Sequence, residues 1–451
     1  MKHSAYPKYK PSGVEWLGDV PENWEVKRLK NAFNIFNGST PESSKEEYWD
    51  GDIVWITPED LGNNSNKTIS DSRRKITEPG YADIGATIVP RFSIIISTRA
   101  PIGHIAVTEV PSCTNQGCRS LVPKRNISSD FYYYYLLTSK DNLNSIGKGT
   151  TFIELGNQGL GSYSIPIPPF PEQQAIATFL DRETERIDSL IGKKKKFVEL
   201  LKEKRTALIS RAVTKGLNPK VKMKHSGVEW LGDVPEHWQI KKIKHMTKVI
   251  SKGTTPSTEG FEIIEEGEIR FIKAENLVEN NLSYTPEFFI DNKTNSALSR
   301  SILEENDVLI VIAGATIGKV AVLEKSFLPA NTNQAVCFIR LKERNLSKLV
   351  WYYMQSNIMK QMIAITSVQS AQPNISMGLL KELVYPLPSR PEQQAIIEFL
   401  DQETGKIDDL IVKVETAIEK LKEYRTALIS AAVTGKIDVS TGLNTSRREV
   451  A

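Results

Sequence analysis

The chain has 451 residues, which is long for one ordinary domain and predicts two or three. Hydrophobic residues make up 40% and charged residues 25%, as in ordinary globular proteins, and the net charge of +4 neither requires nor excludes a nucleic-acid partner. No apolar run reaches the length of a membrane span, and the first residues lack the hydrophobic stretch of a signal peptide.

In chain order, the first recognisable feature is a block that occurs twice. Ser12–Trp24 reads Ser-Gly-Val-Glu-Trp-Leu-Gly-Asp-Val-Pro-Glu-Asn-Trp, and Ser226–Trp238 repeats it with one position changed. Two more blocks, which start at Pro171 and at Leu201, recur 220 positions later. Because the first block recurs after 214 positions, the copies are collinear and the second globular part carries a net insertion of six residues. The chain is therefore an internal duplication.

The middle of each copy predicts paired strands whose apolar residues are kept while their polar turn residues differ. Residues 93–107 and 308–322 each read as a β-branched strand, a glycine-containing turn and a second strand, and residues 52–57 and 268–273 predict another matching pair. In the turn, Arg99 stands opposite Gly314 and His104 opposite Lys319. This pattern is typical of two readers of different targets, although neutral drift of loops would also produce it.

A long helix is predicted after each globular part. Residues 171–213 carry apolar residues at a three-four spacing over several heptads, and the second copy repeats this frame. At 1.5 Å per residue each helix is about 60 Å long, so the natural partner for its apolar stripe is the other helix. The pair should be antiparallel, because parallel helices would require residues 214–225 to run back about 60 Å, which overstretches even a fully extended chain of that length.

These elements predict an α+β fold with two mixed α/β globular domains and a pseudo-twofold axis. Two long antiparallel helices, which form a coiled coil, join the domains. We expect globular domains at 1–168 and 216–388, helices at 169–215 and 389–436, and a C-terminal tail at 437–451. Since the second copy of the Trp block directly follows the first helix, the first copy should dock beside the end of the second helix.

The repeated blocks resemble those of the specificity subunits of type I restriction–modification enzymes, over essentially the whole chain. The resemblance rests on the Ser12 block, on Pro-Glu-Gln-Gln-Ala-Ile before each long helix, and on Arg-Thr-Ala-Leu-Ile-Ser-x-Ala-Val-Thr at each helix end. It implies that each globular domain is a target recognition domain that reads one half of a bipartite, asymmetric site in double-stranded DNA. It also implies that the helices set the spacing and bind two modification subunits, which restriction subunits join in the cytoplasm.

The same resemblance implies that this chain is not itself an enzyme and has no catalytic residues, metal or cofactor. S-adenosylmethionine, ATP and Mg²⁺ are expected on partner subunits. In agreement, the sequence has no Gly-x4-Gly-Lys-[Ser/Thr] phosphate loop and no Asn-Pro-Pro-aromatic or Asp-Pro-Pro-Tyr methyltransferase motif. Cys113, Cys118 and Cys337 fit neither a disulfide framework nor a zinc set, so we expect reduced thiols. A self-contained nuclease or methyltransferase and a coiled-coil scaffold without DNA recognition remain the alternatives.

Base reading requires hydrogen-bonding side chains on loops that can enter the major groove, and backbone contacts require basic or hydroxyl side chains. For each candidate the alternative is an ordinary solvated loop residue. The candidates in the first domain are Arg73, Arg74, Arg99, His104, Lys148, Thr150 and Thr151. Their expected counterparts in the second, with Lys252-Gly-Thr-Thr matched to Lys148-Gly-Thr-Thr, are Lys252, Thr254, Thr255, Lys273, Asn276 and Lys319.

Two repeated polar or aromatic features are expected to serve the fold instead. The triplet Thr-Asn-Gln occurs identically at 114–116 and 332–334, so it should hold a turn and not select a sequence. The tyrosine run 132–135 and its match at 351–353 should pack in the core from a helix after the hairpin.

Overall fold

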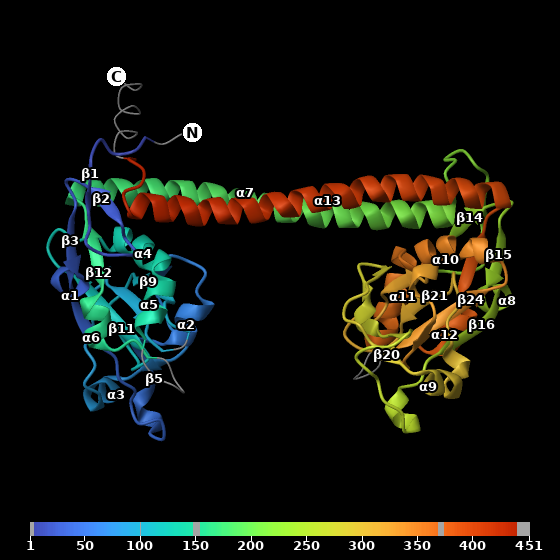
Figure 1. Ribbon diagram of the computed structural model, residues 1–451, viewed down its shortest axis with the longest axis horizontal. Helices are drawn as coiled ribbons and strands as arrows, with labels where there is room; N and C mark the ends of the chain where they lie inside the picture. Colours follow the sequence, from blue (N-terminus) through green and yellow to red (C-terminus); the bar gives the residue numbers. More distant parts are fainter. Residues whose placement is uncertain (1–3, 100, 148–153, 369–373, 440–451) are drawn as a thin grey trace. The chain divides into compact units, whose positions relative to one another are not determined.

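The computed structural model describes residues 4–99, 101–147, 154–368 and 374–439. The chain forms two compact units (Figure 1): unit 1 comprises residues 1–193 and 417–451, and unit 2 comprises residues 194–416. Each unit contains a mixed globular domain and part of both long helices, α7 (Phe170–Lys215) and α13 (Arg390–Val433). The predicted α+β class, with two mixed domains and two long helices, is confirmed.

The globular domain of unit 1 is built on two sheets. Its strands are β1 Tyr9–Pro11, β2 Asp19–Pro21, β3 Glu25–Arg28, β4 Phe33–Asn37, β5 Trp49–Ile56, β6 Thr68–Ile69, β7 Lys75–Ile76, β8 Ile94–Ser97, β9 Ile105–Thr108, β10 Ser112–Thr114, β11 Cys118–Pro123 and β12 Ser164–Ile167. The sheet orders are β4-β11-β8-β9-β6 and β10-β5-β7, with β1-β2 and β12-β3 as separate pairs. The helices are α1 Leu29–Ala32, α2 Pro58–Asn63, α3 Glu78–Asp83, α4 Ser129–Thr138, α5 Lys140–Ile146 and α6 Asn157–Ser162.

Unit 2 repeats this plan with local differences. Its strands are β13 Met223–His225, β14 Asp233–Pro235, β15 Gln239–Lys242, β16 Thr247–Lys252, β17 Ile269–Ile272, β18 Leu277–Val278, β19 Asn281–Leu282, β20 Phe289–Ile290, β21 Val308–Val311, β22 Val320–Val322, β23 Ala330–Thr332, β24 Val336–Leu341 and β25 Val384–Leu387. The main sheets run β16-β24-β21-β22 and β20-β17-β23. The helices are α8 Ile243–Met246, α9 Asn292–Ala297, α10 Ser347–Met354, α11 Asn357–Val368 and α12 Met377–Glu382, and the short 3-10 helices include η5 Lys325–Phe327.

Buried β-branched strands and aromatic helices form the cores. All four residues of β8 are buried, as are all four of β21, because these strands lie inside their sheets and are covered on both faces. Tyr132 and Tyr135 of α4, and Tyr353 of α10, are at most 2% exposed, so the predicted core role of the tyrosine run is confirmed. The three cysteines are free and buried, and burial raises the pKa of the Cys113 and Cys337 thiols to about 12.

In each unit the two long helices pair antiparallel. In unit 1 Arg425 of α13 lies 3.0 Å from Asp188 of α7, and in unit 2 Arg205 of α7 lies 2.9 Å from Asp408 of α13. Such partly exposed ion pairs contribute only about 1 kcal/mol, so the buried apolar seam supplies most of the pairing energy. The seam residues spaced three or four apart include Ile187, Ile191, Val198, Leu201, Ile407, Ile411, Val414 and Ile418.

The repeated Trp block docks beside helix ends in both units. In unit 1 the Trp24 indole donates a hydrogen bond to Glu172 of α7 at 2.9 Å, and Lys436, just after α13, donates to the Asp19 carbonyl at 2.9 Å. In unit 2 the Trp238 indole donates to Glu392 at 3.3 Å. The prediction that the first block docks beside the end of the second helix is therefore confirmed within unit 1.

Candidate DNA interface

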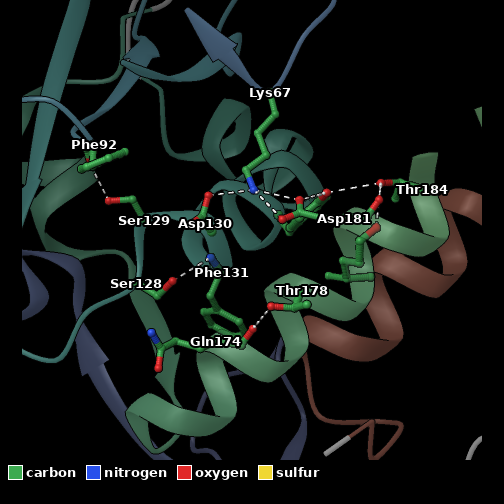
Figure 2. A network of polar contacts seen from close by, with 12 residues as sticks. Lys67, Phe92, Ser128, Ser129, Asp130, Phe131, Gln174, Thr178, Asp181 and Thr184 are labelled. Carbon is green, nitrogen blue, oxygen red and sulfur yellow. Dashed lines mark hydrogen bonds and ion pairs between the residues drawn. The ribbon is translucent and has the colours of Figure 1, made fainter. Parts of the chain in front are cut away.

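A polar network fastens the globular domain of unit 1 to α7 (Figure 2). Lys67 forms ion pairs with Asp130 of α4 at 2.7 Å and with Asp181 of α7 at 2.8 Å, and the Tyr134 hydroxyl donates to Asp181 at 2.7 Å. Although burial opposes its charge, the pairs with the two carboxylates raise the pKa of the Lys67 ammonium. These contacts attach the globular domain, and with it the loops that it bears, to α7.

Unit 2 builds the same anchor from a different cation. Asp401 of α13 accepts a hydrogen bond from the Tyr352 hydroxyl at 2.7 Å, as Asp181 does from Tyr134. The ammonium of Lys348, on α10, lies 2.6 Å from Asp401. Both units therefore have the carboxylate and the tyrosine at this contact. The lysine precedes β6 in unit 1 but lies on α10 in unit 2.

The β8–β9 and β21–β22 turns place His104 and Lys319 at the same position. The Ser97 N–H donates to the His104 carbonyl at 2.8 Å, and the Val311 N–H donates to the Lys319 carbonyl at 2.8 Å. Both side chains are partly exposed. Their alignment in the sequence is confirmed, and an imidazole in unit 1 replaces an ammonium in unit 2.

The alignment of Arg99 with Gly314 is wrong by one residue. Arg99 bridges to Glu154, and the equivalent bridge in unit 2 is made by Ala313 with Asn374. The turn in unit 2 is one residue longer. Ile96 pairs with Ile105 across the turn of unit 1, and the equivalent pair in unit 2 is Ile310 with Val320. The counterpart of Arg99 is therefore the small apolar Ala313, and the two turns also differ in length, which the sequence did not indicate.

Arg99 is exposed but already has a carboxylate partner. Its guanidinium lies 3.2 Å from Glu154, which is also 3.4 Å from the largely buried Arg119. One carboxylate between two guanidinium groups leaves a net positive charge at this edge of the domain. Lys148, Thr150 and Thr151, which were also predicted to bind DNA, lie outside the described residues.

Arg73 and Arg74 lie just before β7 and are both exposed. The Arg73 guanidinium lies 2.6 Å from Glu59, and the Arg74 guanidinium stacks over the Trp49 ring at 3.6 Å from its centroid. The pairing of β7 with β5, and of β20 with β17, places Glu287 and Phe288 at the equivalent positions in unit 2. An arginine pair in one domain thus corresponds to an acidic and an aromatic residue in the other.

The match of Lys252-Gly-Thr-Thr with Lys148-Gly-Thr-Thr is also wrong. Lys252 ends β16, which pairs with β24 as β4 pairs with β11, so its counterpart is Asn37 at the end of β4. Gly38 and Gly253 follow these strands, and a Cβ at either glycine would overlap the backbone of the Thr-Asn-Gln triplet.

The Thr-Asn-Gln triplet holds these loops, as predicted. Thr40 donates to the Gln116 side chain, and Thr255 donates to the Gln334 side chain in the same way. Lys252 is exposed and Thr254 is partly exposed. Sequence reasoning missed the Asn37–Thr40 loop as the matching surface of unit 1, although the shared Gly-x-Thr-Pro pattern would have revealed it.

Asn276 serves the fold of its loop. It is 6% exposed, its Oδ1 accepts the Lys273 N–H at 3.0 Å, and its amide donates to the Pro286 carbonyl at 2.8 Å. Asp60 accepts the Thr57 N–H at 2.8 Å in the same place in unit 1. Because its polar groups are used internally, we leave Asn276 out of the interface. Lys273 is partly exposed, and its ammonium stacks over a phenylalanine ring.

Lys319 lies in a cationic hollow of unit 2 that sequence reasoning missed. Arg205 of α7 and Lys360 of α11 line this hollow together with Lys319. These residues lie far apart in the sequence, so no local pattern predicts the cluster.

The described residues contain no group of three or more His, Cys, Asp or Glu side chains that could hold a metal ion.

In the described part of the chain, no helix combines the length and the apolar character needed to cross a membrane.

Comparisons with known proteins agree with this architecture. A family model described as the type I restriction modification DNA specificity domain matches residues 21–200 and 235–420. The type I restriction enzyme MjaIX specificity subunit of Methanocaldococcus jannaschii is 27% identical over 94% of this chain and 95% of its own length. The EcoBI specificity subunit of Escherichia coli is 23% identical over 94% of this chain and 88% of its own.

Solved structures show the same fold. A chain from a structure of a type I R-M system superposes with a TM-score of 0.70 at 16% identity, over 93% of this chain and 99% of that one. The HsdS subunit from Thermoanaerobacter tengcongensis superposes with a TM-score of 0.53 at 17% identity, over 93% and 98%. With two family matches that together span most of its length, the chain belongs to the type I restriction–modification DNA specificity subunits, the non-catalytic DNA-recognition components of these systems.

Proposed function

We propose that the chain reads one asymmetric, bipartite sequence in double-stranded DNA, with one half-site bound by each unit. The observation that carries this proposal is the contrast between a shared scaffold and changed loop residues. Equivalent positions hold Arg99 and Ala313 in one turn, and Arg73 and Glu287 just before β7 and β20. Side chains of different hydrogen-bonding capacity at one position favour different base edges, so identical half-sites are not expected.

The residues of the proposed interface are exposed or partly exposed loop residues of each domain. In unit 1 they are Arg73, Arg74, Arg99, His104 and the Asn37–Thr40 loop; in unit 2 they are Lys252, Thr254, Thr255, Lys273 and Lys319. Lys148, Thr150 and Thr151 stay in the proposal on sequence grounds alone. Arginine and lysine on loops suit both phosphate contacts and bidentate reading of guanine.

The long helices take the second role in the proposal. Their antiparallel pairing within each unit supports a spacer that sets the distance between half-sites, and their outer faces are proposed to bind two modification subunits. Exposed apolar residues on these helices support a protein partner, because large side chains in water are otherwise unfavourable: Leu190, Phe197, Leu200, Leu410, Val412 and Tyr424. Restriction subunits would join this core in the cytoplasm, and S-adenosylmethionine, ATP and Mg²⁺ would be bound by the partners.

Selection from a random duplex library tests this proposal directly. The chain, assembled with its modification partner, should enrich duplexes with two defined half-sites separated by a gap of fixed length and free sequence. Exchanging residues 25–165 for those of another specificity subunit should change one half-site and leave the other intact. A single uninterrupted motif would contradict the bipartite reading, and enrichment of no motif would favour a scaffold without DNA recognition.

A further inference from the structure

A hollow of about 350 Å³ in unit 2 gathers three cationic side chains. It lies where the β21–β22 turn and the start of α11 meet the second half of α7. Arg205, Lys319 and Lys360 line it, together with the neutral polar side chains of Thr206, Asn280 and Gln355. None of the described residues that line the hollow is acidic.

Hydrogen bonds to neighbouring side chains hold two of the cations, Arg205 and Lys360, in place. The Arg205 guanidinium donates to Asp408 at 2.9 Å and to the Gln355 side-chain oxygen at 2.9 Å, and only 16% of its side chain is exposed. The Lys360 ammonium donates to the Thr206 hydroxyl at 2.9 Å. These contacts orient the donors before any ligand arrives, which lowers the entropic cost of binding.

The charges in the hollow are not balanced. Asp408 compensates only one of the three, and the described residues provide no carboxylate within ion-pair distance of Lys319 or Lys360. Partial burial and the neighbouring Arg205 charge lower the pKa of the Lys360 ammonium, which indicates that these like charges repel each other. An anion in the hollow would relieve this repulsion.

We propose that this hollow binds a phosphate group of the DNA backbone, with Lys319 and Lys360 as direct donors and Arg205 as the fixed third cation. The inference rests on the proposed function of the chain. Charge-assisted hydrogen bonds from arginine and lysine to phosphate oxygens are strong, and several can converge on one phosphate. Lys319 then positions the DNA beside the turn and reads no base.

The inference also predicts a difference in phosphate binding between the two units. Unit 1 keeps the arginine–aspartate pair, as Arg425 with Asp188 at 3.0 Å, but has His104 at the position of Lys319. An imidazole is a weaker phosphate partner than an ammonium. At this turn, therefore, unit 2 should make a stronger phosphate contact than unit 1.

The salt dependence of DNA binding tests the inference. Duplex affinity is measured between 50 and 200 mM salt for the assembled protein and for the variants Lys319→Gln and Lys360→Gln, each chosen to remove the charge and keep a polar side chain. Loss of one phosphate contact should reduce the slope of log K against log salt by about 0.9 and weaken specific and mismatched duplexes by the same factor. Lys325→Gln, an exposed lysine of η5 outside the hollow, is the matched control and should leave the slope unchanged.

The outcomes are distinguishable. Unchanged slopes in both variants overturn the inference, as does a changed sequence preference in Lys319→Gln, which would make this residue a base reader. If inorganic phosphate raises the melting temperature of the parent protein but not of Lys360→Gln, while the DNA slopes stay equal, the hollow binds free phosphate and the DNA assignment is wrong. A parent protein that does not discriminate between sequences would instead contradict the proposed function. Melting temperatures of both variants identify a folding defect, and Lys319→Gln, in a partly exposed turn, keeps the test valid if Lys360→Gln is unstable.

Discussion

Lengthening both long helices by one heptad should lengthen the gap between the two half-sites. The insertion duplicates residues 197–203 in α7 and 410–416 in α13, which face each other in the antiparallel register set by Arg205 and Asp408. A seven-residue insertion preserves the apolar seam, because the seam repeats every seven residues. Both helices must change together, since an insertion in one alone would break the pairing.

The size of the effect follows from helix geometry. Seven residues at 1.5 Å each add about 10.5 Å, which corresponds to about three base pairs at 3.4 Å each. Three base pairs also rotate the DNA by roughly 100°, because B-DNA turns once in about 10.5 base pairs. We therefore expect the preferred gap to grow by about three base pairs, with weaker binding, because the second half-site is rotated away from its domain.

The assay is competitive selection among duplexes that carry both half-sites with gaps of different length. The parent protein and the insertion variant are compared on the same pool, and the half-site sequences are read from the enriched duplexes. An insertion variant that folds and still prefers the parent gap would refute the assignment of spacing to the helices. Changed half-sites with an unchanged gap would refute it as well.

Further predictions concern the elements that hold each domain in place. Gly253→Ala should destabilise unit 2 by about 1–3 kcal/mol, because the added Cβ would overlap the Thr332 backbone, and thermal melting measures this. Lys67→Met should lower stability by about 1–2 kcal/mol, since it leaves the Asp181 carboxylate without its cation, although solvent screens part of the loss; a melting temperature equal to that of the parent protein would contradict the network of Figure 2. The pKa of Glu392 is lowered, because its hydrogen bonds outweigh the effect of burial. The stabilising contribution of Glu392 is therefore complete above the ordinary glutamate pKa of about 4.3 and is lost as the pH falls through the pKa in the folded protein. Measured as melting temperature against pH, the loss of stability between pH 5 and pH 3 should be smaller in Glu392→Gln than in the parent protein.

Periodicity and repetition revealed most of the fold. The three repeated blocks predicted two copies of one plan, and the three-four spacing predicted the long helices, because burial of a continuous stripe imposes that spacing. Chain connectivity then selected antiparallel pairing, which the Asp188–Arg425 ion pair illustrates. Apolar alignment also placed His104 opposite Lys319, since both flank buried strands.

Turn positions were less predictable, for a physical reason. Polar turns carry no burial pattern, so the extra residue of the β21–β22 turn could not be placed, and Arg99 was aligned one position away from Ala313. The short Lys-Gly-Thr-Thr similarity outweighed chain order in the match of Lys148 with Lys252, and only the pairing of β16 with β24 resolves it. Asn276 reads as an exposed loop residue until its capping hydrogen bonds are visible.

The cationic hollow shows the limit most clearly. Arg205 and Lys360 are more than a hundred positions apart, and neither stands in a motif that predicts phosphate binding. They meet because α7 leaves its own globular domain and lies against the next one, which is a property of the tertiary arrangement. Long-range clusters of this kind require the structure.

Methylome sequencing of the host with and without this gene tests the central claim most directly. The account predicts that the gene is required for methylation of one asymmetric motif with two half-sites and a gap of constant length. Loss of the gene should remove that motif and no other, and the Lys319→Gln variant should keep its sequence. An unchanged set of methylated motifs after deletion, in a host whose modification partner is intact, would contradict the account.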